Sequence, residues 1–95
     1  MKSKEEFIRM LHAKIDEWNG KIDKLEAKRS RIEAESREEF YARIAELKSK
    51  KMQVEEKLEE VKKSGDSAFQ DLKSGMELAL DSMAEALNSA MSRFK

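Results

Sequence analysis

The sequence contains no cysteine and no proline, and each absence is informative. Without cysteine, the chain has no disulfide, no thiolate nucleophile and no cysteine ligand for zinc. Proline is costly inside helices and usually collects in loops, so its absence from all 95 residues favours a chain that is mostly helical. We therefore expect an all-α fold.

Net charge and aromatic residues are also scarce. Twenty basic and twenty acidic side chains cancel, so the whole chain has no net field to attract nucleic acid or an anionic bilayer. Charged residues make up 42% of the chain and aromatic residues 6%, which suits a solvated rod or helical bundle. A chain this short forms one domain and buries limited surface unless it associates. We expect a single domain over residues 1–95, no nucleic-acid partner, and association with another chain.

A long stretch from residue 7 to residue 61 carries apolar residues at steps of three and four, with Gly20 its only glycine. Glu, Lys and Arg of mixed sign surround this stripe, as in a helix that buries a narrow seam and leaves its other faces in water. A narrow seam needs a partner. The predicted self-association residues of the N-terminal half are Ile8, Leu11, Ile15, Trp18, Ile22, Leu25 and Ile32.

Whether the chain reverses between residues 32 and 40 decides the architecture. The apolar pattern shifts by one residue there, and Ser36 with Glu39 could form a capping box ahead of a second helix. However, residues 24–63 contain no Gly, Pro, Asn or Asp, and reversal without such residues is uncommon. We therefore predict a continuous helix over about residues 3–63. The alternative is a three-helix bundle of residues 3–35, 37–63 and 66–94.

A chain reversal is predicted at Ser64, Gly65 and Asp66. Gly65 can adopt the left-handed conformation that often ends a helix, and Asp66 or Ser67 can cap the next one. The chain is then a long helical hairpin: a helix over about residues 3–63, a turn at 64–66 and a shorter helix over 67–94.

The last thirty residues are richer in apolar side chains, because fourteen of them are Ala, Leu, Met or Phe. Their spacing follows an eleven-residue repeat, close to the natural period of a straight helix. Core packing in the hairpin is the first interpretation. Methionine adapts to varied apolar surfaces, so a face for a protein client or a lipid surface is the alternative. The residues of this hairpin-packing or partner face are Phe69, Leu72, Met76, Leu80, Met83, Leu87, Met91 and Phe94.

The helix lengths indicate an overhang. At about 1.5 Å per residue, the long helix would extend roughly 90 Å and the last helix about 42 Å. The N-terminal seam would then lack an intramolecular partner, and exposing such side chains costs on the order of 1.5–3 kcal/mol each. We therefore predict a homodimer or tetramer in which residues 1–35 self-associate and residues 36–95 form the hairpin.

Catalytic and metal-binding chemistry has little basis in this sequence. His12 is the only histidine, and although Asp16 lies four residues on, a solvated surface histidine is the commoner arrangement. Carboxylate pairs would need a dry concave pocket to separate their pKa values. We expect no enzymatic activity, no metal and no cofactor. No export segment is recognisable and acidic residues interrupt the apolar span 76–91, so a cytoplasmic location is expected.

Four segments carry a resemblance to a known group of proteins. They are the opening Lys4 to Phe7, Ile15-Asp16-Glu17-Trp18-Asn19, Ile22-Asp23-Lys24-Leu25-Glu26-Ala27-Lys28, and Asp71-Leu72-Lys73-Ser74-Gly75. Over most of its length the chain resembles small bacterial coiled-coil proteins described as stress-related. The resemblance implies a cytoplasmic, helical, non-enzymatic protein and supplies no functional residues. The last helix is also similar to the eleven-residue repeats of apolipoproteins, although it lacks their prolines and basic flanks.

Overall fold

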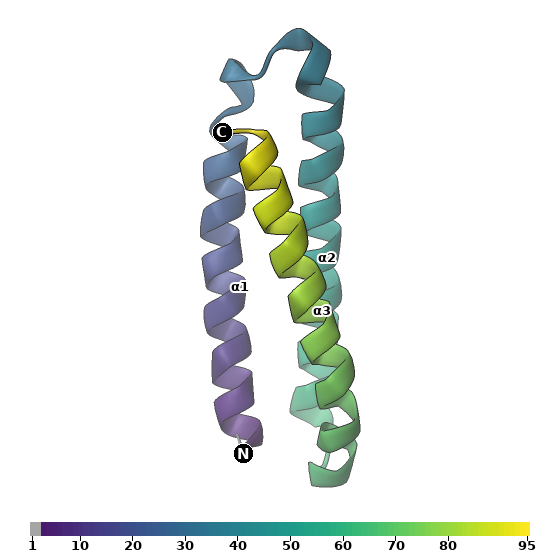
Figure 1. The fold of residues 1–95 in the computed structure, drawn as a ribbon. Coiled ribbons are helices and arrows are strands. Elements are labelled where there is room, and N and C mark those ends of the chain that lie inside the picture. Colours follow the sequence, from purple (N-terminus) through teal and green to yellow (C-terminus); the bar gives the residue numbers. More distant parts are fainter. Residues whose placement is uncertain (1–2) are drawn as a thin grey trace.

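The computed structural model describes residues 3–95, which form three helices: α1 (Lys4–Glu26), α2 (Arg37–Lys63) and α3 (Asp66–Arg93). Helices α1 and α3 run parallel, and α2 runs antiparallel to both (Figure 1). The bundle measures 50 × 19 × 17 Å. The predicted all-α class is confirmed. Of the two predicted architectures, the structure has the three-helix bundle.

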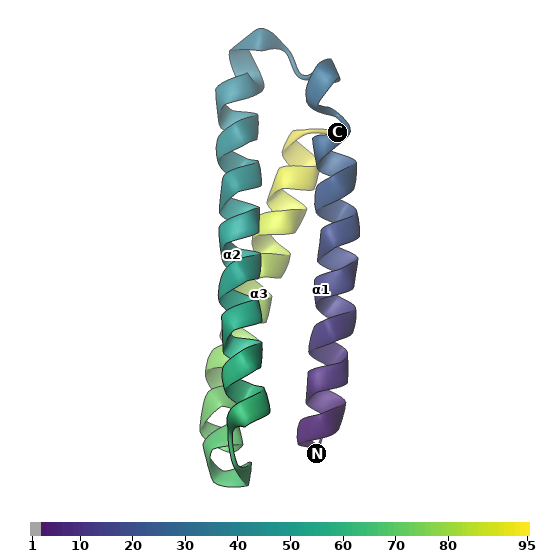
Figure 2. The same cartoon turned by 180° about the vertical axis from the view of Figure 1, so that it is seen from behind.

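The prediction of a continuous helix over residues 3–63 is wrong. Between α1 and α2 lie two short 3-10 helices, Arg29–Arg31 and Ala34–Ser36, separated by the extended residues Ile32 and Glu33. This connection arches over one end of the bundle (Figure 2). No residue from 3 to 95 has a positive φ, so the reversal needs none of the usual turn residues. Two extended residues suffice, and the reversal brings the apolar seam of α1 onto the other helices.

The starts of α1 and α2 differ in their caps. The Ser3 hydroxyl accepts a hydrogen bond from the backbone N–H of Glu6 at 3.2 Å, so Ser3 is the N-cap of α1. The predicted capping box of Ser36 with Glu39 is wrong. Ser36 precedes α2 but makes no capping bond, because its backbone is already near-helical (φ −104°, ψ −4°), whereas a capping residue is usually extended.

The turn between α2 and α3 lies where it was predicted, but its geometry differs. Gly65 has φ −79° and ψ 173°, so the predicted left-handed conformation is wrong. Asp66 and Ser67 are the first two residues of α3, and neither caps it. Ser64 is also extended, and its hydroxyl donates to the Val61 carbonyl at 2.7 Å. As in the α1–α2 connection, extended residues with negative φ accomplish the reversal.

One hydrophobic core is shared by all three helices. An edge-to-face aromatic pair lies near each end of the bundle: Phe7 with Phe69, ring centroids 5.6 Å apart, and Phe40 with Phe94, 5.2 Å apart. The buried residues of the core are Phe7, Leu11, Ile15, Trp18, Ile22, Leu25, Phe40, Ile44, Leu47, Val54, Leu58, Val61, Phe69, Met76, Met83, Leu87, Ala90 and Phe94.

Polar contacts also join α1 to the α2–α3 hairpin. Lys51 Nζ donates to Asn19 Oδ1 at 2.6 Å, and Lys48 Nζ lies 2.6 Å from Glu26 Oε1. Asn19, which stands beside Gly20, therefore contributes to an interhelical contact inside a continuous α1. Through these contacts and the shared core, α1 packs on α2 and α3 of its own chain.

Candidate functional site

The structure places the predicted self-association residues inside the chain's own core. Leu11, Ile15, Trp18, Ile22 and Leu25 are buried, and Ile8 and Ile32 are partly buried against the same core. The premise that this seam lacks an intramolecular partner is therefore wrong, since the chain reversal supplies α2 and α3. Phe7, which the sequence reasoning left out, is also buried; its position four residues before Leu11 was the available signal. Self-association itself stays a prediction.

The predicted face of the last helix is divided between the core and its edge. Phe69, Met76, Met83, Leu87 and Phe94 are buried, whereas Leu72, Leu80 and Met91 are partly buried. Leu80 and Met91 each line a pocket between α1 and α3. Two pockets therefore lie between the parallel helices α1 and α3, at different heights along the bundle.

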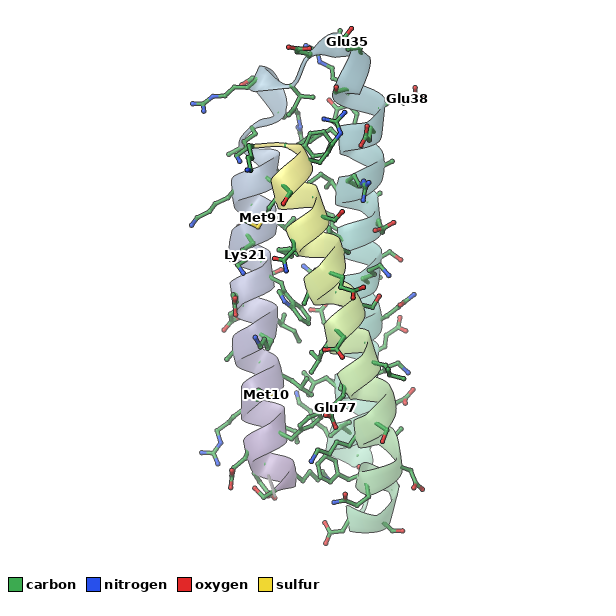
Figure 3. The ribbon with its side chains drawn as sticks, in the orientation of Figure 1. Met10, Lys21, Glu35, Glu38, Glu77 and Met91 are labelled. Carbon is green, nitrogen blue, oxygen red and sulfur yellow. The ribbon has the colours of Figure 1, made fainter. Side chains whose placement is uncertain are left out.

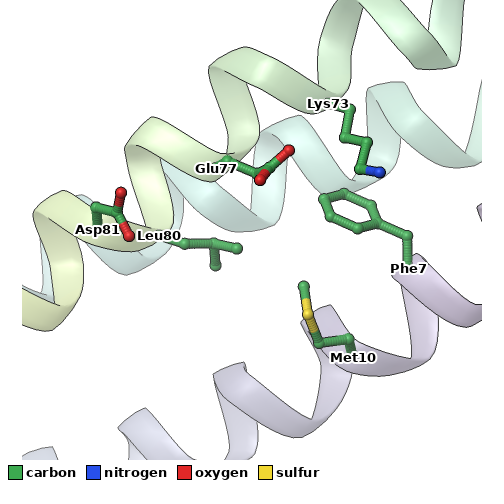
Figure 4. Close-up of a pocket in the computed structure, with 6 residues that line it drawn as sticks. All are labelled: Phe7, Met10, Lys73, Glu77, Leu80 and Asp81. Carbon is green, nitrogen blue, oxygen red and sulfur yellow. The ribbon is translucent and has the colours of Figure 1, made fainter. Parts of the chain in front are cut away.

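The first pocket lies toward the N-terminal end of α1 and has a volume of about 380 Å³ (Figure 4). Its apolar residues are Phe7, Met10 and Leu80, and Lys73, Glu77 and Asp81 supply its charges. Lys73 Nζ stands 5.9 Å from the centre of the Phe7 ring, within cation–π range. Two carboxylates against one ammonium give this pocket a slight acidic excess.

The second pocket lies toward the C-terminal end of α1 and has a volume of about 340 Å³. We call it the basic pocket. Figure 3 places Met91 of α3 near Lys21 of α1 at this level. Its lining includes four cations and no carboxylate; the complete lining is Lys21, Lys24, Leu25, Ala27, Lys28, Arg31 and Met91.

The basic pocket was missed by the sequence reasoning, although a signal was present. Lys21, Lys24, Lys28 and Arg31 are separated by three, four and three residues, which places Lys21 and Lys24 on one side of α1 and Lys28 just beyond its end. The balanced charge of the whole chain concealed this stripe. Its opposite wall, Met91, lies sixty residues further along the chain from Arg31, and only the fold brings the two together.

The four cations of the basic pocket differ in their contacts. Lys28 Nζ donates to the Phe94 carbonyl at 3.0 Å. Lys21 Nζ lies 3.0 Å from the Glu17 carboxylate, and its hydrogen bond and charge hold the pKa of Glu17 below the ordinary value. Within residues 3–95, the side chains of Lys24 and Arg31 have no hydrogen bond or ion pair. Two of the four cations are thus available to an anion.

Residues 3–95 bring together no group of three His, Cys, Asp or Glu side chains able to hold a metal ion. His12 is exposed on α1. In the same part of the chain, every helix is too short or too polar to cross a membrane.

The fold and its pockets define the class of protein: an antiparallel three-helix bundle with a concave surface between its two parallel helices. Compared with protein-family models, curated proteins and solved structures, the chain has no match in any of the three.

Proposed function

We propose that the chain is a non-enzymatic protein of helix–helix contacts that self-associates by exchanging α1 between two copies. In this exchange the α1–α2 connection straightens, and α1 packs on α2 and α3 of a second chain. The α1 seam, which includes Leu11 and Trp18, would then join two chains. A structural or stress-protective role in the cytoplasm agrees with the resemblance noted above.

The backbone of the α1–α2 connection carries this proposal. Between α1 and α2, the two residues clearly outside the helical region are Ile32 (φ −77°, ψ 128°) and Glu33 (φ −62°, ψ 147°). Their φ values already suit a helix, so a change in ψ at these two residues would remove the reversal. The connection contains no glycine or proline, and most of its side chains favour helix.

Few contacts hold the closed connection. Arg37 Nε donates to the Ile32 carbonyl at 3.4 Å, and the Arg29 guanidinium lies 5.9 Å from the Tyr41 ring centre; Arg37, Arg29 and Tyr41 are all exposed. Surface contacts of this kind contribute little. Lys28 Nζ also donates to the Phe94 carbonyl at 3.0 Å. Straightening also removes Ile32 from its partly buried position, which is the larger loss.

Exchange would preserve the contacts of α1 while changing the chain that provides them. The core positions of Leu11 and Trp18, and the contacts of Asn19 and Glu26 with α2, could all form between chains. Straightening adds backbone hydrogen bonds across the connection. The entropy cost of association opposes exchange and makes it dependent on protein concentration.

The test compares two substitutions of Glu33. Proline fits the closed connection, because φ at Glu33 is −62° and the preceding Ile32 is extended. The N–H of Glu33 donates to no group within residues 3–95, so proline removes no hydrogen bond there. In a straight α1–α2 helix the same proline would stand in the interior, at a cost of about 3 kcal/mol or more. Glu33→Ala removes the same carboxylate and permits both conformations.

Mass and shape would be measured by light scattering and small-angle X-ray scattering over a range of protein concentrations. We expect the unmodified chain and Glu33→Ala to form dimers about 90 Å or more in length, because a helix over residues 4–63 is that long. Glu33→Pro should retain the mass of one chain and the 50 Å bundle. Dimers of Glu33→Pro equal in amount to those of Glu33→Ala would rule out exchange. A single-chain mass for the unmodified protein throughout would rule out self-association.

A further inference from the structure

We propose that the basic pocket binds one single-chain amphiphilic anion, such as a medium-chain fatty-acid carboxylate. The carboxylate would contact Lys24 and Arg31, and the first part of the hydrocarbon tail would lie on Ala27 and Met91. This inference does not depend on the exchange of α1.

The charge of the pocket selects an anion. Four cationic side chains line one pocket whose lining contains no carboxylate, although the chain as a whole has no net charge. Favourable interaction with the helix dipole accounts for Lys24, which stands in the last turn of α1. It does not account for Arg31, which lies beyond the end of that helix. An anion between these side chains would relieve their mutual repulsion.

The arrangement of the cations provides both a framework and free donors. Lys28 is held by the Phe94 carbonyl, so its ammonium group adds positive potential from a defined position. Lys21 is paired with Glu17, and that carboxylate offsets its charge. Lys24 and Arg31 are exposed and make no competing side-chain contact within residues 3–95. A guanidinium can bind a carboxylate through two parallel hydrogen bonds, and an ammonium can add a third.

The apolar residues of the pocket select an amphiphile over a simple anion. The exposed Ala27 and the partly buried Met91, which forms the wall contributed by α3, supply the accessible apolar surface of the pocket; Leu25 is 1% exposed and adds almost none. A flexible thioether side chain adapts well to a hydrocarbon tail. The volume of about 340 Å³ lies at the lower end of the range for small-molecule sites, roughly 300–1,000 Å³, and therefore suits one chain.

A bilayer fits the same surface poorly. Helices that lie on membranes usually carry many Lys and Arg on their polar face. The exposed face of α3 instead carries Glu77, Asp81 and Glu85. The apolar part of the basic pocket also lies between two helices, where a single tail can enter and a flat surface cannot. These features favour a monomeric amphiphile.

The proposal would be tested by isothermal titration of the full chain with decanoate below its micellar concentration. Parallel titrations would use inorganic phosphate and vesicles of phosphatidylglycerol. We expect one decanoate per chain, and an affinity at least about tenfold lower for the Lys24→Gln/Arg31→Gln double variant. The matched control, Lys57→Gln/Lys63→Gln, removes two lysines of α2 outside the pocket and should bind as the unmodified chain does. Met91→Gln should weaken decanoate binding and leave phosphate binding unchanged.

Several results would overturn the proposal. These are no binding of decanoate, phosphate binding as tight as that of decanoate, vesicle binding without decanoate binding, or equal losses in the two double variants. Circular dichroism of each variant establishes that the bundle is intact. Repeating the titration on Glu33→Pro separates the two proposals, because that variant keeps the connection closed. Suppose that Glu33→Pro binds decanoate and that neither it nor the unmodified protein forms dimers. Self-association is then ruled out, and the amphiphile site is retained.

Discussion

Substitution of a leucine in the α1 seam provides the sharpest test of the fold. Leu11 is 0% exposed in the core, whereas Leu78 on α3 is 71% exposed. Leu11→Ala and Leu78→Ala remove the same atoms from helical positions, so each serves as the other's control. Burial alone distinguishes them.

The expected magnitudes differ widely. Leu→Ala at a well-packed core position costs about 2–5 kcal/mol, through lost transfer free energy and the cavity left behind. At about 0.05–0.15 kcal/mol per residue, a chain of this length has a free energy of unfolding of roughly 5–14 kcal/mol. Leu11→Ala therefore removes a large part of the stability. Leu78→Ala should change it by no more than about 0.5 kcal/mol, as is usual at exposed positions.

The measurement is urea unfolding followed by circular dichroism at several protein concentrations, with thermal unfolding alongside. For a domain of this size, each kcal/mol corresponds to about 4–8 °C in Tm, so Leu11→Ala should lower Tm by at least about 8 °C. Where the chain is monomeric, this loss should not depend on protein concentration, because Leu11 packs within its own chain. A loss seen only at concentrations that produce dimers would refute the bundle and restore the long hairpin. Equal losses for the two variants would contradict the burial assigned to Leu11.

Three further predictions follow from the same packing. Gly20→Ala should raise the free energy of unfolding by about 1 kcal/mol in urea, since a Cβ there meets no atom within 4 Å and alanine favours helix; a decrease would contradict the open surface assigned to it. Phe94→Ala should cost about 3–5 kcal/mol in the same assay by removing a buried side chain that packs edge to face on Phe40; a loss under 1 kcal/mol would show that this end of the core is not closed. Arg93→Gln should cost under about 1 kcal/mol, because its bidentate contact with Glu39 is exposed, and thermal unfolding in high salt should reduce the difference; an equal loss at all salt concentrations would contradict an ionic origin.

The sequence was most informative about local structure. The periodic spacing identified Leu11 and Trp18 as one apolar side of a helix, and the structure buries both. The α2–α3 turn was also found, because Gly65 interrupts two strongly periodic stretches. The predicted backbone conformation of Gly65 was wrong. A glycine can be extended or left-handed, and the sequence does not distinguish the two.

The sequence could predict only one side of the basic pocket. The stripe of Lys21, Lys24 and Lys28 follows from helical spacing, but its significance depends on what faces it. Met91 faces it because α3 lies parallel to α1, and that arrangement requires two chain reversals. Without the first reversal, the lysine stripe would have been a solvated helix face.

The sequence by itself thus determined that the chain is helical, which faces are apolar, and where α2 gives way to α3. Only the tertiary structure decided that the α1 seam packs on its own chain. The local difference between a continuous and a reversed connection lies mainly in ψ at Ile32 and Glu33, and propensity at two residues amounts to about 1 kcal/mol or less. Burial of the α1 seam is worth about 1.5–3 kcal/mol for each large side chain. The free energy gained by burying the α1 seam is larger than the local preference. It depends on residues far away in the sequence, so residues 27–36 by themselves do not reveal it.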